Sequence, residues 1–407
     1  MTRMPQPPAP RDPRAVVFAR ARARAGIVPP YLLLRIAAAE EYYDVAAEAA
    51  RRSLLRDEPM RELRLGGAHP GLLPHEHTRS TTEREGAATG AGAATEAAAP
   101  TDAERVPEAG TAEPVLAEPA PDRRVSDAEG AESLPGRLAR VEGQPATGDA
   151  AVDQAYDGLG EVWALFERVY GRDAIDGEGS PLEATVHFGD RYDNAFWDGE
   201  RMVFGDGDGE VFRGFTQSLS VIGHELAHGV TEMTARLRYR DQSGALNEHV
   251  SDVFGALTEQ YAMGQDADAA TWLIGEGIFT ELVQGRALRS MLEPGTAYDD
   301  DVLGRDPQPA HLRDYIVTDA DNGGVHLNSG IPNRAFALAA VEVGGFAWEH
   351  VGRVWYDTLT GGTLRPNDGF AVFATATLAA ARDRYGEGSR EVRAVANGWD
   401  AVGVEPE

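Results

Sequence analysis

The amino-acid sequence predicts an α+β fold with two lobes, a β-rich lobe followed by a mostly α-helical one. Through residues 184–212, apolar and polar residues alternate between Gly and Asp turns, as they do in short strands joined by hairpins. After Tyr239 the apolar residues mostly recur at helical spacing, for example in residues 333–344 and 370–386. Because the chain has 407 residues, 42% of them hydrophobic, it is long enough to fill two packed lobes and to carry appendages.

Composition divides the chain into four parts. Residues 1–66 hold twelve Arg against eight Asp and Glu, although the whole chain has a net charge of −28. Residues 67–130 are expected to be a disordered linker, since their Ala, Gly, Thr, Glu and Pro carry too little apolar surface to offset ordering entropy. Residues 131–235 form the expected first lobe and residues 236–407 the helical lobe. The first lobe is expected to open with a helix that buries Val152, Tyr156, Leu159, Trp163 and Phe166.

The basic N-terminal part contains a segment that is able to fold. Pro29 and Pro30 indicate an apolar turn, and the residues that follow, as far as Leu63, favour a helix. The residues available to this helix for burial are Leu33, Ile36, Ala37 and Tyr43.

Charge and composition exclude several functional classes. The acidity of the chain argues against nucleic acid or an anionic membrane as a partner. No run of eighteen apolar residues could span a membrane, and the absence of cysteine excludes disulfides and thiol catalysis. The N-terminus has arginines but lacks the uninterrupted apolar stretch of a normal signal peptide, so export, if it occurs, is expected to use another route.

The strongest chemical signal is the run HELAH. On a helix, residues four apart share one face, so His224 and His228 could both offer ring nitrogens to a single cation. In this HExxH arrangement the two histidines hold zinc, while Glu225 is the base that takes a proton from the attacking water.

A catalytic zinc site needs a third protein ligand and one open position. Residues 243–262 have the pattern of another amphipathic helix, with Glu248 near its start. Asp252, one turn later, could accept the outer N–H of a ligating histidine. His249 is expected at the surface. The apolar face of this helix is Leu246, Val250, Val253, Phe254 and Leu257.

HELAH, NEHVSD and DNGGVHLNSG (321–330), in this order, resemble the thermolysin family of zinc endopeptidases. The resemblance extends over residues 192–209, over RALRSM (286–291) and into AVANGWDAVGV near the C-terminus, and it covers roughly residues 131–407. It implies a two-lobed fold with the HELAH helix between the lobes and the active site in the cleft. It also implies a secreted, neutral metalloendopeptidase with one zinc per chain, although the absence of a visible signal peptide leaves cytoplasmic retention open. We expect a monomer that acts on peptides and proteins.

The PPYLL motif is similar to the short propeptide of the protealysin-like branch of this family. The resemblance implies that residues 1–66 are a propeptide that docks on the catalytic body. The chain would then be made as a zymogen, with Pro30, Tyr31 and Leu32 contributing more to docking than charge does.

The same resemblance assigns the remaining catalytic roles. His326 and Tyr239 match the family's donors to the oxyanion that forms at the scissile carbonyl. Asp321 fits the carboxylate that orients the imidazole of His326.

The substrate-binding positions also come from the resemblance. Asn194 and Ala195 match the edge-strand position that pairs with the substrate backbone, and Arg289 matches the arginine that binds a substrate carbonyl. The implied specificity is for bonds on the N-terminal side of hydrophobic residues. The matching pocket lining is Phe212, Phe215, Val221, Ile274, Ile278 and Leu288.

Calcium binding is where the sequence departs from the family. At the positions of the family's double site it has Ser220, Thr271 and Leu273, so that only Glu259 and Glu276 keep a carboxylate. We therefore expect the double site to be lost, while Asp266 and Asp268 leave room for a rearranged weak site. For Asp206 and Asp208 in GDGDG, a tight turn is favoured over a calcium loop.

Two other functions fit the same ligands. One is a zinc-binding protein without catalysis, although every residue that the chemistry needs is present. The other is an aminopeptidase, which would need a carboxylate site for the free amine of the substrate, and no motif for one is visible. His75 and His77, in the expected linker, are not expected to bind metal.

Overall fold

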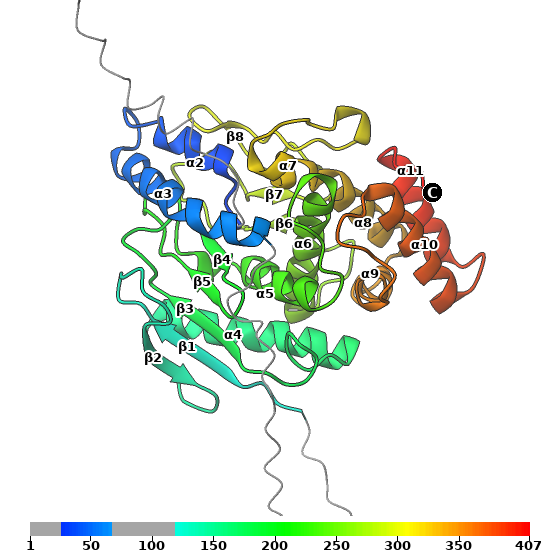
Figure 1. The fold of residues 1–407 in the computed structure, drawn as a ribbon, viewed down its shortest axis with the longest axis horizontal. Helices are drawn as coiled ribbons and strands as arrows, with labels where there is room; N and C mark the ends of the chain where they lie inside the picture. The colour runs from blue at the N-terminus through cyan, green and yellow to red at the C-terminus, as the bar shows by residue number, and fades with distance from the viewer. Residues whose placement is uncertain (1–25, 67–118) are drawn as a thin grey trace, which may run out of the picture. The chain divides into compact units, whose positions relative to one another are not determined.

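The computed structural model describes residues 26–66 and 119–407 (Figure 1). His75, His77 and most of the expected linker lie outside the described residues. The described part has the α+β composition and the two lobes that the sequence predicts, so the fold class is confirmed.

The first lobe is built on one mixed five-stranded sheet with the order β2-β1-β3-β5-β4. The two pairs β1·β3 and β3·β5 are parallel, and the two outer strands β2 and β4 run antiparallel to their neighbours. β4 is an edge strand in which Ala195 pairs with Phe204 of β5, so its other side is open to a further chain. The strands are β1 (Arg123–Asp127), β2 (Arg137–Val141), β3 (Leu182–Val186), β4 (Ala195–Trp197) and β5 (Met202–Phe204).

The expected linker extends too far, because the lobe begins before residue 131. β1 lies inside the range 67–130, which was expected to be disordered. It is nevertheless part of the sheet, where it pairs with β2 and β3. Its sequence, RRVSD, contributes one fully buried apolar side chain, Val125. A strand this short and polar shows no hydrophobic pattern, so its sequence cannot be told apart from that of a linker.

Three helices bring the first lobe and the site together. α4 (Ala150–Ala164), which continues as the π-helical turn η1 (Leu165–Val169), begins at Asp149, whose carboxylate accepts the N–H groups of Ala151 and Val152. α5 (Leu219–Met233) packs against α4 and against α6 (Asp241–Met263). Both α5 and α6 are buried on nearly all sides, which is why their polar residues have partners inside the protein.

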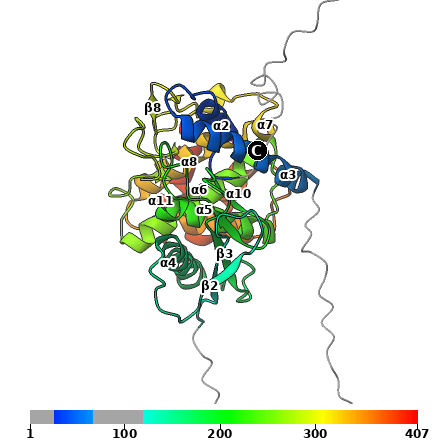
Figure 2. The ribbon, with the colours of Figure 1, turned by 90° about the vertical axis from the view of Figure 1, so that its left-hand side faces the viewer.

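The second lobe is mostly helical, as predicted. In Figure 1, α8 to α11 lie on the far side of α6 from the sheet, and in both views α4, β2 and β3 lie at the opposite end from α2 and α7 (Figures 1 and 2). Its helices are α7 (Asp321–Asn328), α8 (Gly330–Val343), α9 (Val351–Thr360), α10 (Phe370–Tyr385) and α11 (Arg390–Ala401). Its short elements are the pairs β6 (Leu273–Ile274) with β7 (Arg289–Ser290) and β8 (Asp299–Asp300) with β9 (Gly304–Arg305), and the turn η3 (Leu312–Asp314). A further turn, η2 (Phe215–Gln217), precedes α5.

The N-terminal segment forms two helices where the sequence suggested one. α2 (Pro30–Ala37) starts at a proline, which suits the first helical position because its missing N–H would have no partner there. α3 (Asp44–Gly66) follows after a turn, and the N–H groups of Val45 and Ala46 donate to the carboxylate of Glu210. The side chains of Leu33, Ile36 and Ala37 are buried as expected, and Tyr43 is half-buried.

The GDGDG stretch (205–209) follows β5 without regular secondary structure, and Asp208 opens a turn closed by its side chain. Asp208 accepts the N–H groups of Glu210 and Val211, each at 2.6 Å, and Asp206 contacts the ring of His187 at 2.9 Å.

Among the described residues, no helix combines the length and the apolar character that crossing a membrane requires.

Candidate active site

Three buried side chains from α5 and α6 meet in the interior. The Nε2 atoms of His224 and His228 lie 3.1 Å apart, and each lies 3.5 Å from a carboxylate oxygen of Glu248. Within residues 26–66 and 119–407, this is the group of His and carboxylate side chains whose ligand atoms come close enough to share a metal ion. Glu225, next to His224 on α5, is fully buried.

The donor set fits zinc. Zinc bonds of roughly 2.0–2.2 Å in a tetrahedron place neighbouring ligand atoms about 3.3–3.6 Å apart, close to the separations found here. Two imidazoles and one carboxylate are a ligand set of catalytic rather than structural zinc, because they leave the fourth position to water or substrate.

A buried ionic network fixes the ring of His224. Its Nδ1 lies 2.8 Å from Asp252 Oδ1, and Asp252 also accepts from the guanidinium of Arg289, at 2.7 Å from Nη2, and from Asn333 Nδ2 at 2.8 Å. Burial alone would raise the pKa of Asp252, but Arg289 and His224 hold it well below its usual range. The ionised Asp252 therefore keeps the proton of His224 on Nδ1 and leaves Nε2 free to bind metal.

The ring of His228 is held by polar side chains of α6. Its Nδ1 lies 2.8 Å from Asn247 Oδ1 and 3.1 Å from the hydroxyl of Ser251. Asn247, Ser251 and Asn333 were not among the residues expected at the site. Each is a common helix residue with no spacing signature.

His249 was expected at the surface, and this prediction is wrong. The residue is fully buried. The indole N–H of Trp355 donates to its Nε2 at 2.7 Å, so its Nδ1 carries the hydrogen and donates to Asn333 Oδ1 at 2.8 Å. Burial lowers the pKa of His249 to about 4. A neutral His249 therefore orients Asn333, which in turn bonds Asp252.

His326 reaches the cluster from α7, whose first residues have an unusual backbone. Asp321 and Asn322 both have φ of 53°, and Gly323 and Gly324 have φ of 89° and 75°. At Gly323 the positive φ strains any residue with a Cβ, and that Cβ would also lie 3.1 Å from the Cα of Asp241, so this turn favours glycine.

The turn brings Asp321 onto His326, with Oδ1 at 2.6 Å from Nδ1 and Oδ2 at 2.9 Å from the backbone N–H. Burial alone would lower the pKa of His326, but the Asp321 and Glu248 carboxylates raise it above its usual value. The Nε2 of His326 lies 3.3 Å from the hydroxyl of Tyr239, which also contacts Glu248. His326 and Tyr239 thus point two polar groups at the same space beside the ligand cluster.

The N-terminal segment contacts the residues that the sequence matched to substrate binding. Ala195 accepts the N–H of Ile27 at 3.0 Å, and Arg289 donates to the carbonyl of Ile27 at 2.9 Å. Asn194 Oδ1 accepts the N–H of Val28 at 2.9 Å. Gly26 to Val28 therefore lies along the open edge of β4 in the way an added strand would.

The residues matched to the apolar pocket are all buried. They belong to the same hydrophobic cluster as Ile27 and Val28. The backbone of Leu288 donates to Ile274, and the rings of Phe212 and Phe215 lie 5.5 Å apart. The set is Phe212, Phe215, Val221, Ile274, Ile278 and Leu288.

Two of the positions matched to the calcium site, Ser220 and Glu259, lie side by side. Glu259 is half-buried, its partial burial raises the pKa of its carboxyl, and Ser220 lies within hydrogen-bonding reach of it. The hydroxyl of Ser220 also receives the backbone N–H of Gly275 at 3.1 Å.

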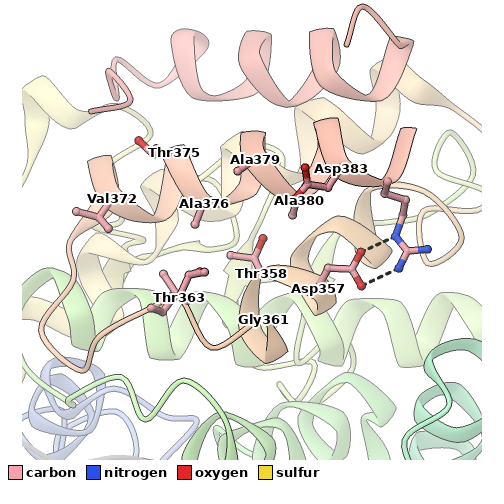
Figure 3. A pocket seen from close by; sticks show the side chains of 12 residues that line it. Asp357, Thr358, Gly361, Thr363, Val372, Thr375, Ala376, Ala379, Ala380 and Asp383 are labelled. Atoms are coloured by element: carbon pink, nitrogen blue, oxygen red, sulfur yellow. Dashed lines mark hydrogen bonds and ion pairs between the residues drawn. The ribbon is translucent and has the colours of Figure 1, made fainter. Parts of the chain in front are cut away.

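A surface pocket between α9 and α10 lies apart from this chemistry (Figure 3). It is lined mainly by Ala and Thr side chains, and the ion pair of Arg384 with Asp357 lies at one end. None of its lining residues belongs to the ligand cluster or to the groups around His326.

Comparisons with known proteins agree with this geometry. A family model described as the thermolysin metallopeptidase catalytic domain matches residues 134–232, and one described as the thermolysin metallopeptidase alpha-helical domain matches residues 235–404. The chain is 44% identical to an extracellular metalloprotease of Pectobacterium carotovorum over 95% of its own length and 98% of that protein. It is 48% identical to protease PrtS of Photorhabdus over 70% of its own length and 76% of that protein.

A solved structure is similar over nearly the whole chain. It is the precursor of protealysin, a metalloproteinase from Serratia proteamaculans, with a TM-score of 0.75 and 43% identity. The similarity covers 93% of this chain and 99% of the other. With both lobes matched, the chain belongs to the thermolysin family of zinc metallopeptidases, and its resemblance to the protealysin-like branch is confirmed.

Proposed function

We propose that this chain is the precursor of a zinc metalloendopeptidase that cuts peptide bonds on the N-terminal side of hydrophobic residues. The observation that carries the proposal is the buried cluster of His224, His228 and Glu248 at zinc-ligand separations, beside Glu225 and His326. In this proposal the three ligands hold one zinc per chain. When bound, zinc would lower the pKa of water and polarise the scissile carbonyl.

The protein's own groups divide the remaining work. Glu225 takes a proton from the attacking water and passes it to the nitrogen of the leaving amine. His326 and Tyr239 donate hydrogen bonds to the oxygen on which negative charge develops, and Asp321 keeps His326 protonated and oriented. Asn194, Ala195 and Arg289 hold the substrate backbone, since they already bind an extended segment in this way.

Residues 26–66 act in this proposal as the inhibitory propeptide. Burial of Leu32, Leu33 and Ile36 supports docking through apolar contact. Charge also contributes, since Arg52 and Arg56 form ion pairs with Asp190 and Glu132, all four of them partly exposed. Secretion is part of the proposal and is supported by the name of the Pectobacterium relative.

The proposed roles predict that Glu225→Gln binds zinc normally and loses hydrolysis. An amide cannot accept the proton of the water, and loss of a general base costs about 10²- to 10⁴-fold in rate. The measurement is zinc content after dialysis together with cleavage of an N-terminally blocked peptide by the activated chain. Near wild-type turnover by this variant would refute the assigned mechanism.

The same experiment separates the alternatives. Activated wild-type protein that cuts only peptides with a free N-terminus would be an aminopeptidase. Protein that binds zinc but cuts neither the blocked peptide nor a peptide with a free N-terminus would be catalytically silent. Glu248→Gln should lose zinc on dialysis, because two ligands are too few for a stable catalytic site.

A further inference from the structure

One peptide bond of the N-terminal segment lies where a substrate bond should lie. We propose that the full-length chain cuts itself between Gly26 and Ile27, so that the precursor is the first substrate of its own active site. This inference rests on the proposed function, because it uses the same catalytic groups.

Both ends of the peptide group between Gly26 and Ile27 are held. The carbonyl oxygen of Gly26 lies 2.9 Å from His326 Nε2, and the N–H of Ile27 donates to the carbonyl of Ala195 at 3.0 Å. Since the carbonyl oxygen can only accept, His326 must donate to it. Its Nδ1 lies 2.6 Å from Asp321 Oδ1, so the carboxylate holds the ring in the orientation that directs Nε2 at this carbonyl.

The next peptide group, between Ile27 and Val28, is held by different residues. Its carbonyl accepts from Arg289 at 2.9 Å, and its N–H donates to Asn194 at 2.9 Å. Asn194 Nδ2 also approaches the carbonyl of Val28, at 3.4 Å. Three consecutive residues are therefore fixed in a single register.

The position of the catalytic groups decides which bond is exposed to attack. His326 Nε2 lies 3.4 Å from Glu248 and 3.3 Å from the hydroxyl of Tyr239, so the carbonyl of Gly26 borders the ligand cluster. Arg289 instead binds Asp252, which contacts His224 at Nδ1, the nitrogen that does not face the other ligands. The carbonyl of Gly26, and not that of Ile27, is therefore beside the catalytic centre.

Position 26 has no room for a side chain. A Cβ added to Gly26 would lie 2.7 Å from Asn194 Nδ2 and 2.8 Å from the carbonyl oxygen of Ala195. The oxygen belongs to a paired strand and cannot move away easily. Glycine thus lets the chain approach β4 closely enough to place its carbonyl on His326.

Ile27 is the residue directly after the proposed cut. It is apolar, fully buried and part of the main hydrophobic core. The sequence of the segment therefore agrees with the proposed preference for a hydrophobic residue at this position.

The proposed step is a simple hydrolysis. The oxygen of water bonds to the carbonyl carbon of Gly26, and the bond from that carbon to the nitrogen of Ile27 breaks. Glu225 accepts a proton from the water and delivers it to the departing nitrogen, and the second proton of the water follows to the same nitrogen as the new carboxyl group ionises. The products are a carboxylate at Gly26 and an ammonium group at Ile27, which becomes a buried charge beside His326 and weakens the docking of residues 27–66.

The test uses the full-length chain supplied with zinc and follows it by intact mass and N-terminal sequencing. We expect one pair of products, which ends at Gly26 and starts at Ile27. Because the bond is already in place, the rate constant should not depend on chain concentration. The Glu225→Ala variant should keep the bond between Gly26 and Ile27 intact. When wild-type protein is mixed with this variant, it should cut the variant more slowly than it cuts its own chain.

Two variants of the segment test the register. Gly26→Ala should slow the cut at least tenfold, yet activity on a blocked peptide should not fall, because the displaced segment obstructs the site less. Ile27→Asp should have a similar effect, whereas Ile27→Val, which removes one methylene group from this buried side chain, should cost no more than about 10-fold, the low end for one methylene.

A second readout is independent of catalysis. In the Glu225→Ala chain without zinc, the amides of Ile27 and Val28 should be protected from hydrogen exchange, and Gly26→Ala should remove that protection.

The outcomes separate this inference from the proposed function. An active preparation in which the bond between Gly26 and Ile27 stays whole would overturn the inference and leave the function standing. A rate that rises with chain concentration would also overturn it, because the cut would then be made between molecules. Absence of any peptidase activity after removal of residues 1–66 would refute the proposed function itself.

Discussion

Two regions of this protein pair histidine with aspartate, and they differ in their exposure to water. At the active site, His224 with Asp252 and His326 with Asp321 are almost completely buried. At the end of β3, the ring of His187 lies between Asp149 and Asp206, and these three side chains are 25%, 41% and 46% exposed. The contacts are equally short, 2.6 to 3.1 Å, so geometry alone does not distinguish the two regions.

Burial changes what such a pair does. In the interior, each hydrogen bond fixes a tautomer and a ring direction, because no water competes for the same atoms. At the surface, water and salt screen the same contact, so it adds little beyond a shift in the pKa of the histidine. Active-site pairs should therefore affect chemistry and metal binding, and the outer cluster should affect only the dependence of stability on pH.

Among these histidine–aspartate pairs, the largest effect is expected at His326. His326→Ala should lower kcat/KM for a blocked peptide by about 10²- to 10³-fold, because one donor to the developing oxyanion is lost. Zinc content should not change, since His326 is not one of the three ligands. If Asp321 acts through His326, the double variant with Asp321→Asn should lose no more activity than His326→Ala alone. Additive losses would show that Asp321 has a separate role.

A smaller effect is expected one contact behind the metal. Asp252→Asn should weaken zinc binding by about 10- to 100-fold, since His224 loses the carboxylate that orients it. The measurement is zinc affinity by competition with a chelator, and Asp383→Asn, at an exposed position on α10, is the matched control. Unchanged affinity would mean that Arg289 and Asn333 hold the network without the charge of Asp252.

The sequence alone predicted the parts of the site that have a local spacing. His224 and His228 share a helical face, and Glu248 with Asp252 repeats that spacing on the next helix, so both helices could be inferred. His326, Tyr239 and Arg289 came only from the family resemblance. Their contacts join residues far apart in sequence, through a left-handed turn that no periodicity announces.

The supporting residues escaped prediction for a related reason. Trp355, His249 and Asn333 form a chain of hydrogen bonds that ends on Asp252, although they come from α9, α6 and α8. Sequence spacing shows which residues share one helix face but not which faces meet across a lobe. His249 therefore seemed to be a surface residue.

The N-terminal segment shows the same limit in its backbone. The resemblance indicated a docked propeptide, and burial of Leu33 and Ile36 fits that expectation. The register at Gly26, Ile27 and Val28 could not be predicted, because main-chain hydrogen bonds leave no pattern in the side chains.

The smallest effect is expected at His187, and its sign follows from the direction of the shift. Hydrogen bonds to Asp206 and Asp149, which outweigh the opposing effect of burial, raise the pKa of His187 to about 9. An unfolded histidine has a pKa of about 6.5. The stabilisation is therefore fully present below about pH 6.5 and is lost as pH rises through about 9.

His187→Asn should accordingly reduce the difference in the free energy of unfolding between these two pH values. In the wild type this difference should be modest and should shrink in high salt, because all three groups are partly exposed. Urea unfolding of wild type and variant at both pH values, with and without salt, measures it. A variant that lost zinc or peptidase activity instead would break the comparison, because it would show that the outer cluster reaches the active site.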